Sequence, residues 1–126
     1  MIPIPSKLQK RMNEDPAYEQ CMLSGVKGHE CGGRANTREH AIMFQGKRLQ
    51  ELWAIISLCA RGHEVDEYQD AHTMDKQMNI WVALNRATDT ELRAISKSTD
   101  YIRERERLNK IYGPYTPPKP LYESII

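Results

Sequence analysis

The chain has few cysteines, no long apolar run and almost no net charge, and each shortage excludes a class of protein. Three cysteines in 126 residues cannot all pair, so a disulfide scaffold is not expected and the thiols should be reduced. No apolar run approaches the length of a membrane span, and the first residues lack the apolar core of a signal peptide. We therefore expect a cytoplasmic protein without a membrane partner.

A net charge of +1 gives no overall signal for nucleic-acid binding, because strong electrostatic binders are usually far more basic. The basic residues are nevertheless unevenly placed. One group surrounds the centre of the chain: Arg34, Arg38, Lys47, Arg48 and Arg61. A second group, at 103–110, is interleaved with glutamates and is typical of a solvated helix surface.

The length suits one globular domain, and the residue pattern predicts an α+β fold. Short helices are expected from Ser6 to about residue 13, and from Pro16, after an Asp15 cap, to near residue 21. Residues 38–44 predict a strand, and Gly46 predicts the turn that follows it. Residues 49–59 satisfy both a helical and a strand pattern, and we favour a buried strand from about residue 53.

The second half of the chain is expected to be helical. Thr73 is expected to cap a helix with a buried apolar stripe, and a Thr88-x-x-Glu91 capping box should begin the next one. Ser98 is a candidate cap for the last helix, which should stop at Gly113. The proline-rich tail at 114–126 is expected to be extended and is a candidate docking segment for a partner protein.

The stretch from Glu39 to His63 concentrates groups with reactive chemistry. Glu39 and His40 lie in the first expected strand, and His63 comes four residues after Cys59. A neutral imidazole can take a proton from water near pH 7, and a carboxylate with an imidazole can hold a divalent cation. Adjacent strand residues point to opposite faces, so Glu39 and His40 can share one site only at a distorted strand end.

These features together resemble the HNH endonucleases and their ββα-metal finger, in particular small phage-encoded members. The shared pattern is an acid–His strand, a Gly-(Lys/Arg) turn, a Trp-Ala-Ile-Ile strand leading to Cys59, and His63. The segment Met-Asp-Lys-x-x-Asn-x-Trp-x-Ala-Leu-Asn-Arg-Ala-Thr, beginning at Met74, is similar to the helical region after the finger. The resemblance covers residues 21–63 most closely and extends to about residue 113.

The resemblance implies a single domain over 1–113, with a finger core at about 38–70 and a helical cap at about 73–113. It makes His40 the general base, and Glu39 and His63 ligands of a catalytic Mg²⁺, Mn²⁺ or Ni²⁺. Glu67, one helical turn after His63, is the expected third ligand, with His72 as the alternative. DNA is the expected partner, contacted by basic residues beside the finger: Arg38, Lys47, Arg48 and Arg61.

The chain departs from the family pattern in two places. Ala54 follows the tryptophan where the family usually has an asparagine, and Gln50 is a candidate to orient the turn in its place. The two Cys-x2-Cys knuckles of zinc-binding members have each lost their second cysteine. A rebuilt structural Zn²⁺ site has four candidate ligands: Cys21, His29, Cys31 and Cys59.

The expected function is therefore a metal-dependent DNA endonuclease or nickase that acts in the cytoplasm, that of the host if the protein is phage-encoded. The departures favour an alternative, a catalytically degenerate HNH-fold protein that binds DNA as a recombination or packaging accessory of a phage. A third class is an interaction protein that docks through its tail.

Overall fold

The chain folds into α-helices and short antiparallel β-strands in the computed structural model. The structure describes residues 4–24, 26, 34–35, 37–44, 47–59, 69–95 and 100–118. In chain order the elements are α1 (Ser6–Glu14), η1 (Pro16–Glu19), β1 (Thr37–His40), β2 (Met43–Phe44), β3 (Lys47–Arg48), η2 (Leu52–Ala54), β4 (Ile55–Leu58), α3 (Gln69–Arg86), α4 (Asp89–Ile95) and α5 (Asp100–Tyr112). This arrangement confirms the α+β class.

The central pair of strands is β1 and β4, which run antiparallel with Thr37 opposite Leu58 and His40 opposite Ile55. The single strand expected over residues 38–44 is wrong, because β1 ends at His40 and the chain resumes as β2. The backbone changes partner at this point. Ala41 N donates to the Ala54 carbonyl at 2.9 Å, whereas the Ile42 carbonyl accepts from Leu49 N at 2.9 Å. β2 therefore pairs with β3 instead of continuing the pair with β4.

The apolar run before Cys59 forms the buried strand β4, which begins two residues later than expected. Residues 52–54 form the 3-10 turn η2 instead, closed by Ala54 N donating to the Glu51 carbonyl at 3.0 Å. All four residues of β4 are at most 1% exposed. Burial on both faces explains why this strand reads as a continuous apolar run rather than an alternating one.

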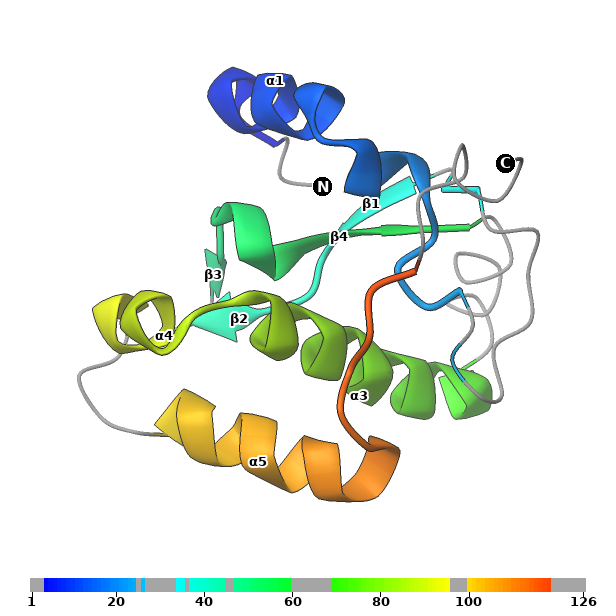
Figure 1. Cartoon of the computed structure of the whole chain (residues 1–126), viewed down its shortest axis with the longest axis vertical. Coiled ribbons are helices and arrows are strands. Elements are labelled where there is room, and N and C mark those ends of the chain that lie inside the picture. Colours follow the sequence, from blue (N-terminus) through cyan, green and yellow to red (C-terminus); the bar gives the residue numbers. More distant parts are fainter. Residues whose placement is uncertain are drawn as a thin grey trace.

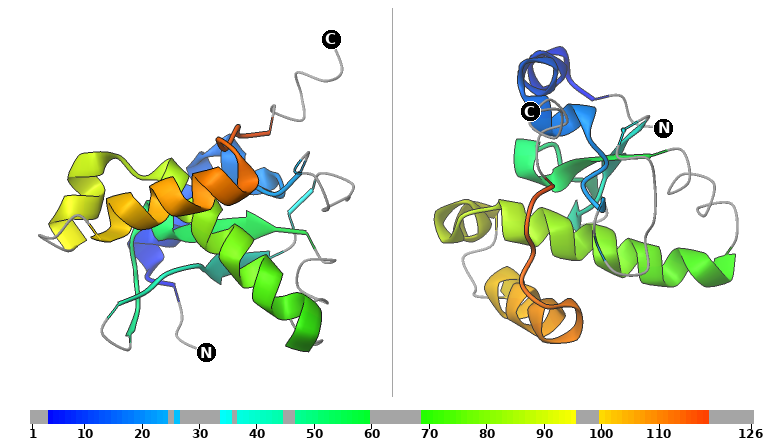
Figure 2. Two further views of the ribbon diagram at one scale, coloured as in Figure 1. Left: turned by 90° about the horizontal axis from the view of Figure 1, so that it is seen from below. Right: turned by 45° about the vertical axis from the view of Figure 1, so that its right-hand side comes forward.

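The elements are stacked in layers, with α1 on one side of the β1–β4 pair and α3 on the other (Figure 1). A second view agrees, and places α5 outside α3 (Figure 2). The long helix α3 packs against η2, β4 and α5, and buries Trp81, Val82 and Leu84 completely or nearly so. α3 is thus the central helix of the core, as its apolar stripe predicts.

Several expected helix ends are confirmed and others are wrong. The Thr88–Glu91 capping box forms in both directions, with Thr88 N donating to Glu91 Oε1 at 2.9 Å and Glu91 N donating to Thr88 Oγ1 at 3.1 Å. The last helix stops at Gly113, whose φ of 87° is the left-handed conformation that favours glycine. Thr73 lies inside α3 and is therefore not its cap.

The N-terminal predictions were only partly right. Helix α1 spans the expected residues, but its N-cap is Pro5 and the cap makes no side-chain hydrogen bond, so Ser6 is the first helical residue. Asp15 does cap the next segment by accepting from Ala17 N at 3.0 Å. That segment is one turn of 3-10 helix, shorter than expected. The expected Ser98 cap lies outside the described residues.

The chain beyond α5 turns back over α3 towards the strands (Figure 1). The Tyr115 ring meets the edge of Trp81 at 5.2 Å between centroids, and its hydroxyl donates to the Met22 carbonyl at 2.8 Å. The first residues of the expected tail therefore belong to the packed domain, and residues 119–126 lie outside the described part. In the described ranges, no helix combines the length and apolar character needed to cross a membrane.

Candidate functional site

His40, the last residue of β1, is held by a side chain from the segment just before η2. Its Nε2 lies 2.8 Å from Oε1 of Gln50. When that amide oxygen accepts the hydrogen bond, Nε2 carries the proton and the other ring nitrogen, Nδ1, keeps its lone pair. A neutral imidazole in this tautomer is oriented to accept a proton at Nδ1, which is the task of a general base.

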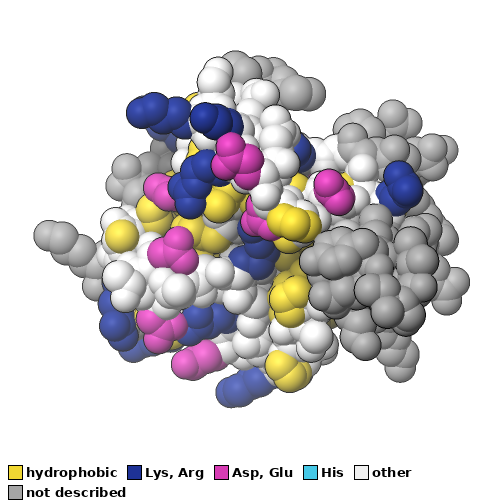
Figure 3. All heavy atoms as spheres, turned by 45° about the horizontal axis from the view of Figure 1, so that its top comes forward, with side chains coloured by type: hydrophobic (Ala, Val, Ile, Leu, Met, Phe, Trp, Pro, Cys, Tyr) yellow, Lys and Arg dark blue, Asp and Glu magenta, His cyan; other side chains and the backbone are white. Residues whose placement is uncertain are grey.

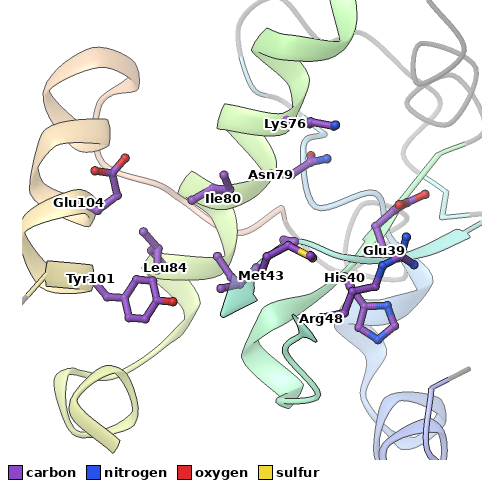
Figure 4. Close-up of a pocket in the computed structure, with 12 residues that line it drawn as sticks. Glu39, His40, Met43, Arg48, Lys76, Asn79, Ile80, Leu84, Tyr101 and Glu104 are labelled. Atoms are coloured by element: carbon purple, nitrogen blue, oxygen red, sulfur yellow. The ribbon is translucent and has the colours of Figure 1, made fainter. Parts of the chain in front are cut away.

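Glu39 and His40 leave β1 in opposite directions (Figure 4). This is the alternation expected of neighbouring residues on a strand, and both side chains are half-buried. Across the ranges that the structure describes, no group of three or more His, Cys, Asp and Glu side chains could hold a metal ion. Any catalytic metal would therefore be completed by side chains outside these ranges.

A pocket of about 690 Å³ lies between this end of the strands and helices α3 and α5. Its wall on the strand side includes Glu39, His40 and Arg48. Its wall on the helix side is formed by two helices (Figure 4). The residues are Lys76, Asn79, Ile80 and Leu84 from α3, and Tyr101 and Glu104 from α5. The candidate base therefore borders a cavity large enough for part of a substrate.

Three of the four basic residues expected to contact DNA are described, Arg38 in β1 and Lys47 and Arg48 in β3. Lys47 and Arg48 form β3 and are both exposed. Arg38 is half-buried; it donates to Asn13 Oδ1 at 2.8 Å and lies over the Tyr18 ring at 5.9 Å. Arg38 thus has a structural role in fixing α1 to β1. Among the described members of this group, Lys47 and Arg48 are open to an anionic partner.

The charged side chains of the surface are mixed in sign. On the face in Figure 3, Lys and Arg side chains are interspersed with Asp and Glu side chains. This mixture of charges agrees with the nearly neutral charge of the whole chain. The surface in this view therefore adds no separate signal for an anionic ligand.

A buried polar network fixes the turn that precedes β4. The Tyr18 hydroxyl lies 2.7 and 2.8 Å from the carbonyl oxygens of Leu52 and Ile55 and shares its one proton between them. Arg86, near the end of α3, donates to the Ile55 carbonyl at 2.8 Å and to the Tyr18 hydroxyl at 2.7 Å. Burial raises the pKa of Tyr18, and the nearby Arg86 opposes that rise. The network ties η1, η2 and α3 together behind the segment that carries Gln50.

Two of the four expected zinc ligands are described, and both are buried. Cys21 is 0% and Cys59 is 5% exposed. Their backbone segments lie side by side, because Met22 N donates to the Ser57 carbonyl at 2.9 Å and Ser57 Oγ donates to the Gln20 carbonyl at 2.6 Å. The fold thus brings together the two segments that carry these cysteines, which are far apart in sequence.

The other expected site residues fall outside the described part of the chain, wholly or in their side chains. His29, Cys31, Arg61, His63 and Glu67 lie outside the described residues, and of His72 only the helical backbone in α3 is described. The grouping of Glu39 with His63 and Glu67 therefore stays a prediction.

Sequence reasoning missed Lys76 and Asn79 as members of this site. Both lie on α3, three residues apart, so they share one helix face. Asn79 is only 9% exposed, and within the described residues its Oδ1 has no hydrogen-bond partner. A polar residue among the apolar residues of the α3 stripe is the signal that could have identified it.

Comparison of the chain with protein-family models, with curated proteins and with solved structures found no match.

Proposed function

We propose that the protein is a metal-dependent DNA endonuclease or nickase of the HNH type, in which His40 activates the attacking water. The observation that carries the proposal is the contact between His40 Nε2 and Gln50 Oε1. It orients the ring and leaves Nδ1 as the proton acceptor. The histidine also borders a pocket that has exposed cationic side chains at its rim, where a phosphodiester would be held.

In this proposal β1, β4 and the helix after them correspond to a ββα-metal finger. The antiparallel pairing of β1 with β4 and the packing of α3 against β4 support that assignment. Glu39, His63 and Glu67 would hold the divalent metal, and a carboxylate such as Glu39 suits Mg²⁺ or Mn²⁺. The bound metal would stabilise the negative charge that develops on the phosphate and on the leaving oxygen.

A structural zinc is a separate part of the proposal. Cys21 and Cys59 lie on adjacent segments, and His29 and Cys31 would complete a set of four ligands. Metal analysis of the purified protein should find one zinc per chain. A protein that contains no zinc after purification in zinc-supplemented medium would contradict this site while leaving the catalytic proposal intact.

The proposal is tested by incubating supercoiled plasmid DNA with the protein and Mg²⁺, Mn²⁺ or Ni²⁺. Nicked or linear product should appear with metal and disappear with EDTA. His40→Ala should lower the rate by about 10²- to 10⁴-fold, the usual contribution of a general base. Arg103 is an exposed residue of α5, away from the proposed site. Its variant Arg103→Ala, purified in parallel, should cleave like the wild type and controls for contaminating nucleases.

Cleavage that is absent with every metal, or unchanged in His40→Ala, would overturn the catalytic proposal. The side chains of Glu39 and His40 point to opposite sides of β1 (Figure 4), and this divergence favours the rival function, a DNA-binding accessory protein with an HNH-like fold. Plasmid binding that survives both EDTA and His40→Ala, without cleavage, would identify that rival.

A further inference from the structure

We propose that the 690 Å³ pocket beside His40 binds one unpaired nucleobase of the nucleic-acid substrate, through the amide of Asn79. The inference rests on the proposed function, since it takes nucleic acid to be the ligand. It adds the class of substrate: a strand whose base is unpaired or has been turned out of the duplex.

The pocket has the size and lining of a site for a flat organic group. Its volume lies within the roughly 300–1,000 Å³ typical of small-molecule sites. Met43, which is exposed, and Ile80, which is half-buried, contribute apolar surface to it, and Tyr101 contributes an aromatic ring. Apolar and aromatic walls suit the faces of a nucleobase, because stacking is favourable for every base.

Asn79 gives the pocket a specific polar group. The residue is about nine-tenths buried, and its Oδ1, which is itself enclosed, makes no hydrogen bond within the part of the chain that the structure describes. A ligand in the pocket would meet this oxygen when the side-chain amide rotates towards the cavity. In Figure 4 the amide extends from α3 towards the side of the pocket that carries Glu39. A buried acceptor without a donor costs free energy, so the site favours a ligand that brings an N–H group. The amino groups and ring N–H groups of bases supply such donors, and asparagine amides commonly pair with adenine.

Cationic side chains at the rim suit the phosphate attached to that base. Arg48 and Lys76 are exposed residues of the pocket lining, one from β3 and one from α3. Two acidic residues, Glu39 and Glu104, also line the pocket. The carboxylate of Glu104 accepts a hydrogen bond from Arg107, which lowers the pKa of that carboxyl. Glu39 is the metal ligand of the proposed centre. This balance of charge fits one phosphate and its base better than a polyphosphate.

The position of His40 joins this pocket to the proposed chemistry. A base seated against Asn79 would place its phosphate at the rim, in the cavity that His40 also lines. A base within a duplex cannot enter a pocket in this way, because it is stacked and paired. The substrate would therefore be a single strand, a gap, a branch point or a duplex from which a base can be flipped.

The experiment distinguishes binding of the nucleobase from binding of the phosphate, in an assay that needs no cleavage. The protein carries His40→Ala and receives no added Mg²⁺, Mn²⁺ or Ni²⁺, so that it does not cleave, and its affinity is measured by fluorescence anisotropy for two oligonucleotides. One is a short single strand of deoxyadenosines, and the other is the same length of abasic deoxyribose phosphates. Adding Asn79→Leu should weaken binding of the first about three- to tenfold, which corresponds to one lost hydrogen bond, and leave the second unchanged.

Lys76→Met is the matched control on the same helix face. It removes a phosphate contact, so it should weaken both oligonucleotides equally. Asn79→Leu should also leave the melting temperature of the unbound protein unchanged or raise it, because it replaces an unsatisfied buried amide with an apolar group of similar size. Equal affinity losses for both oligonucleotides on Asn79→Leu, or no loss for either, would overturn the inference.

A second measurement does not depend on how Asn79→Leu folds. In the His40→Ala protein, the side-chain amide signal of Asn79 should shift in NMR spectra on adding the deoxyadenosine strand, and should not shift with the abasic strand. Identical spectra for the two ligands would count against the pocket. Because neither assay uses cleavage, the inference can stand if the protein binds DNA without cutting it, and can fail while cleavage is confirmed.

Discussion

The Gln50 side chain reaches the His40 ring at 2.8 Å from a segment ten residues further along the chain. The resemblance to HNH endonucleases would place an asparagine at Ala54, which is 0% exposed and whose backbone N–H closes η2. An asparagine there would place a polar amide in the core. Gln50 lies outside that core, half-buried, and its longer side chain spans the gap to the histidine.

Replacing Gln50 tests whether this residue positions His40, the proposed general base. Gln50→Leu should lower kcat for plasmid cleavage roughly 10- to 100-fold with little change in KM, because the ring loses its orientation but the DNA contacts remain. Gln50→Glu should retain more activity, and should move the acidic limb of the pH–rate profile to higher pH, because a carboxylate stabilises the protonated imidazole.

The neighbouring exposed residue offers a matched control, since Glu51→Gln changes one charge without touching the ring. It should leave both kcat and the pH profile as in the wild type. A Gln50→Leu variant with wild-type kcat, or a Gln50→Glu profile that does not move, would contradict a positioning role.

Arg86 should be one of the residues on which stability depends most. Its guanidinium donates to the Ile55 carbonyl and to the Tyr18 hydroxyl. Arg86→Met keeps most of the aliphatic packing but leaves these acceptors without a charged donor, so we expect a loss of about 2–4 kcal/mol in the free energy of unfolding. Urea denaturation measures it, and the exposed Arg103→Met should change stability by no more than about 0.5 kcal/mol. A loss below 1 kcal/mol for Arg86→Met would show that the network is not needed.

The sequence predicted those elements whose signals are local. The capping box at Thr88–Glu91 and the glycine stop at Gly113 form as expected, because both depend on residues within one turn of each other. An antiparallel pair of strands is present, as the resemblance to a ββα finger implies, and it joins the polar segment β1 to the buried strand β4.

The errors lie where a distant contact decides the conformation. β1 ends at His40 because the Ile42 carbonyl accepts from Leu49 instead of from β4, and no local signal marks that change of partner. Likewise, η2 replaces the start of the expected strand. There the Leu52 carbonyl accepts a hydrogen bond from the Tyr18 hydroxyl, which is 34 residues away in sequence. In the candidate site, Asn79 was missed because its importance depends on the pocket that α3 and β1 form together.

The capping box offers a stability test with an internal control. Thr88→Ala removes the acceptor of Glu91 N and should lower the free energy of unfolding by about 1 kcal/mol, the usual contribution of an N-cap. Thr90→Ala, also exposed and in the same helix, should be neutral or slightly stabilising because alanine favours helix. Thermal melts of the two variants give the comparison. Equal melting temperatures would indicate that α4 does not need its cap.

Tyr115 should make the protein less stable in alkaline solution. Burial raises the pKa of Tyr115 to about 12, above its usual 10.0. The unfolded chain releases this proton from about pH 10 upward, whereas the folded protein retains it, so stability is present below pH 10 and is lost as the pH rises towards 12. For this pair of values the loss at pH 11 relative to pH 8 is about 1.4 kcal/mol.

Tyr115→Phe removes the titrating hydroxyl and separates this effect from packing. The variant should be about 1 kcal/mol less stable than the wild type at pH 8, because the hydrogen bond to the Met22 carbonyl is lost. Between pH 8 and pH 11, however, the variant should lose less stability than the wild type. Some alkaline sensitivity should remain, since burial also raises the pKa of Tyr18. Urea unfolding at the two pH values measures both differences. If the stability difference between wild type and variant is the same at pH 8 and pH 11, the Tyr115 hydroxyl is not protected by the fold and the contact with Met22 does not persist in solution.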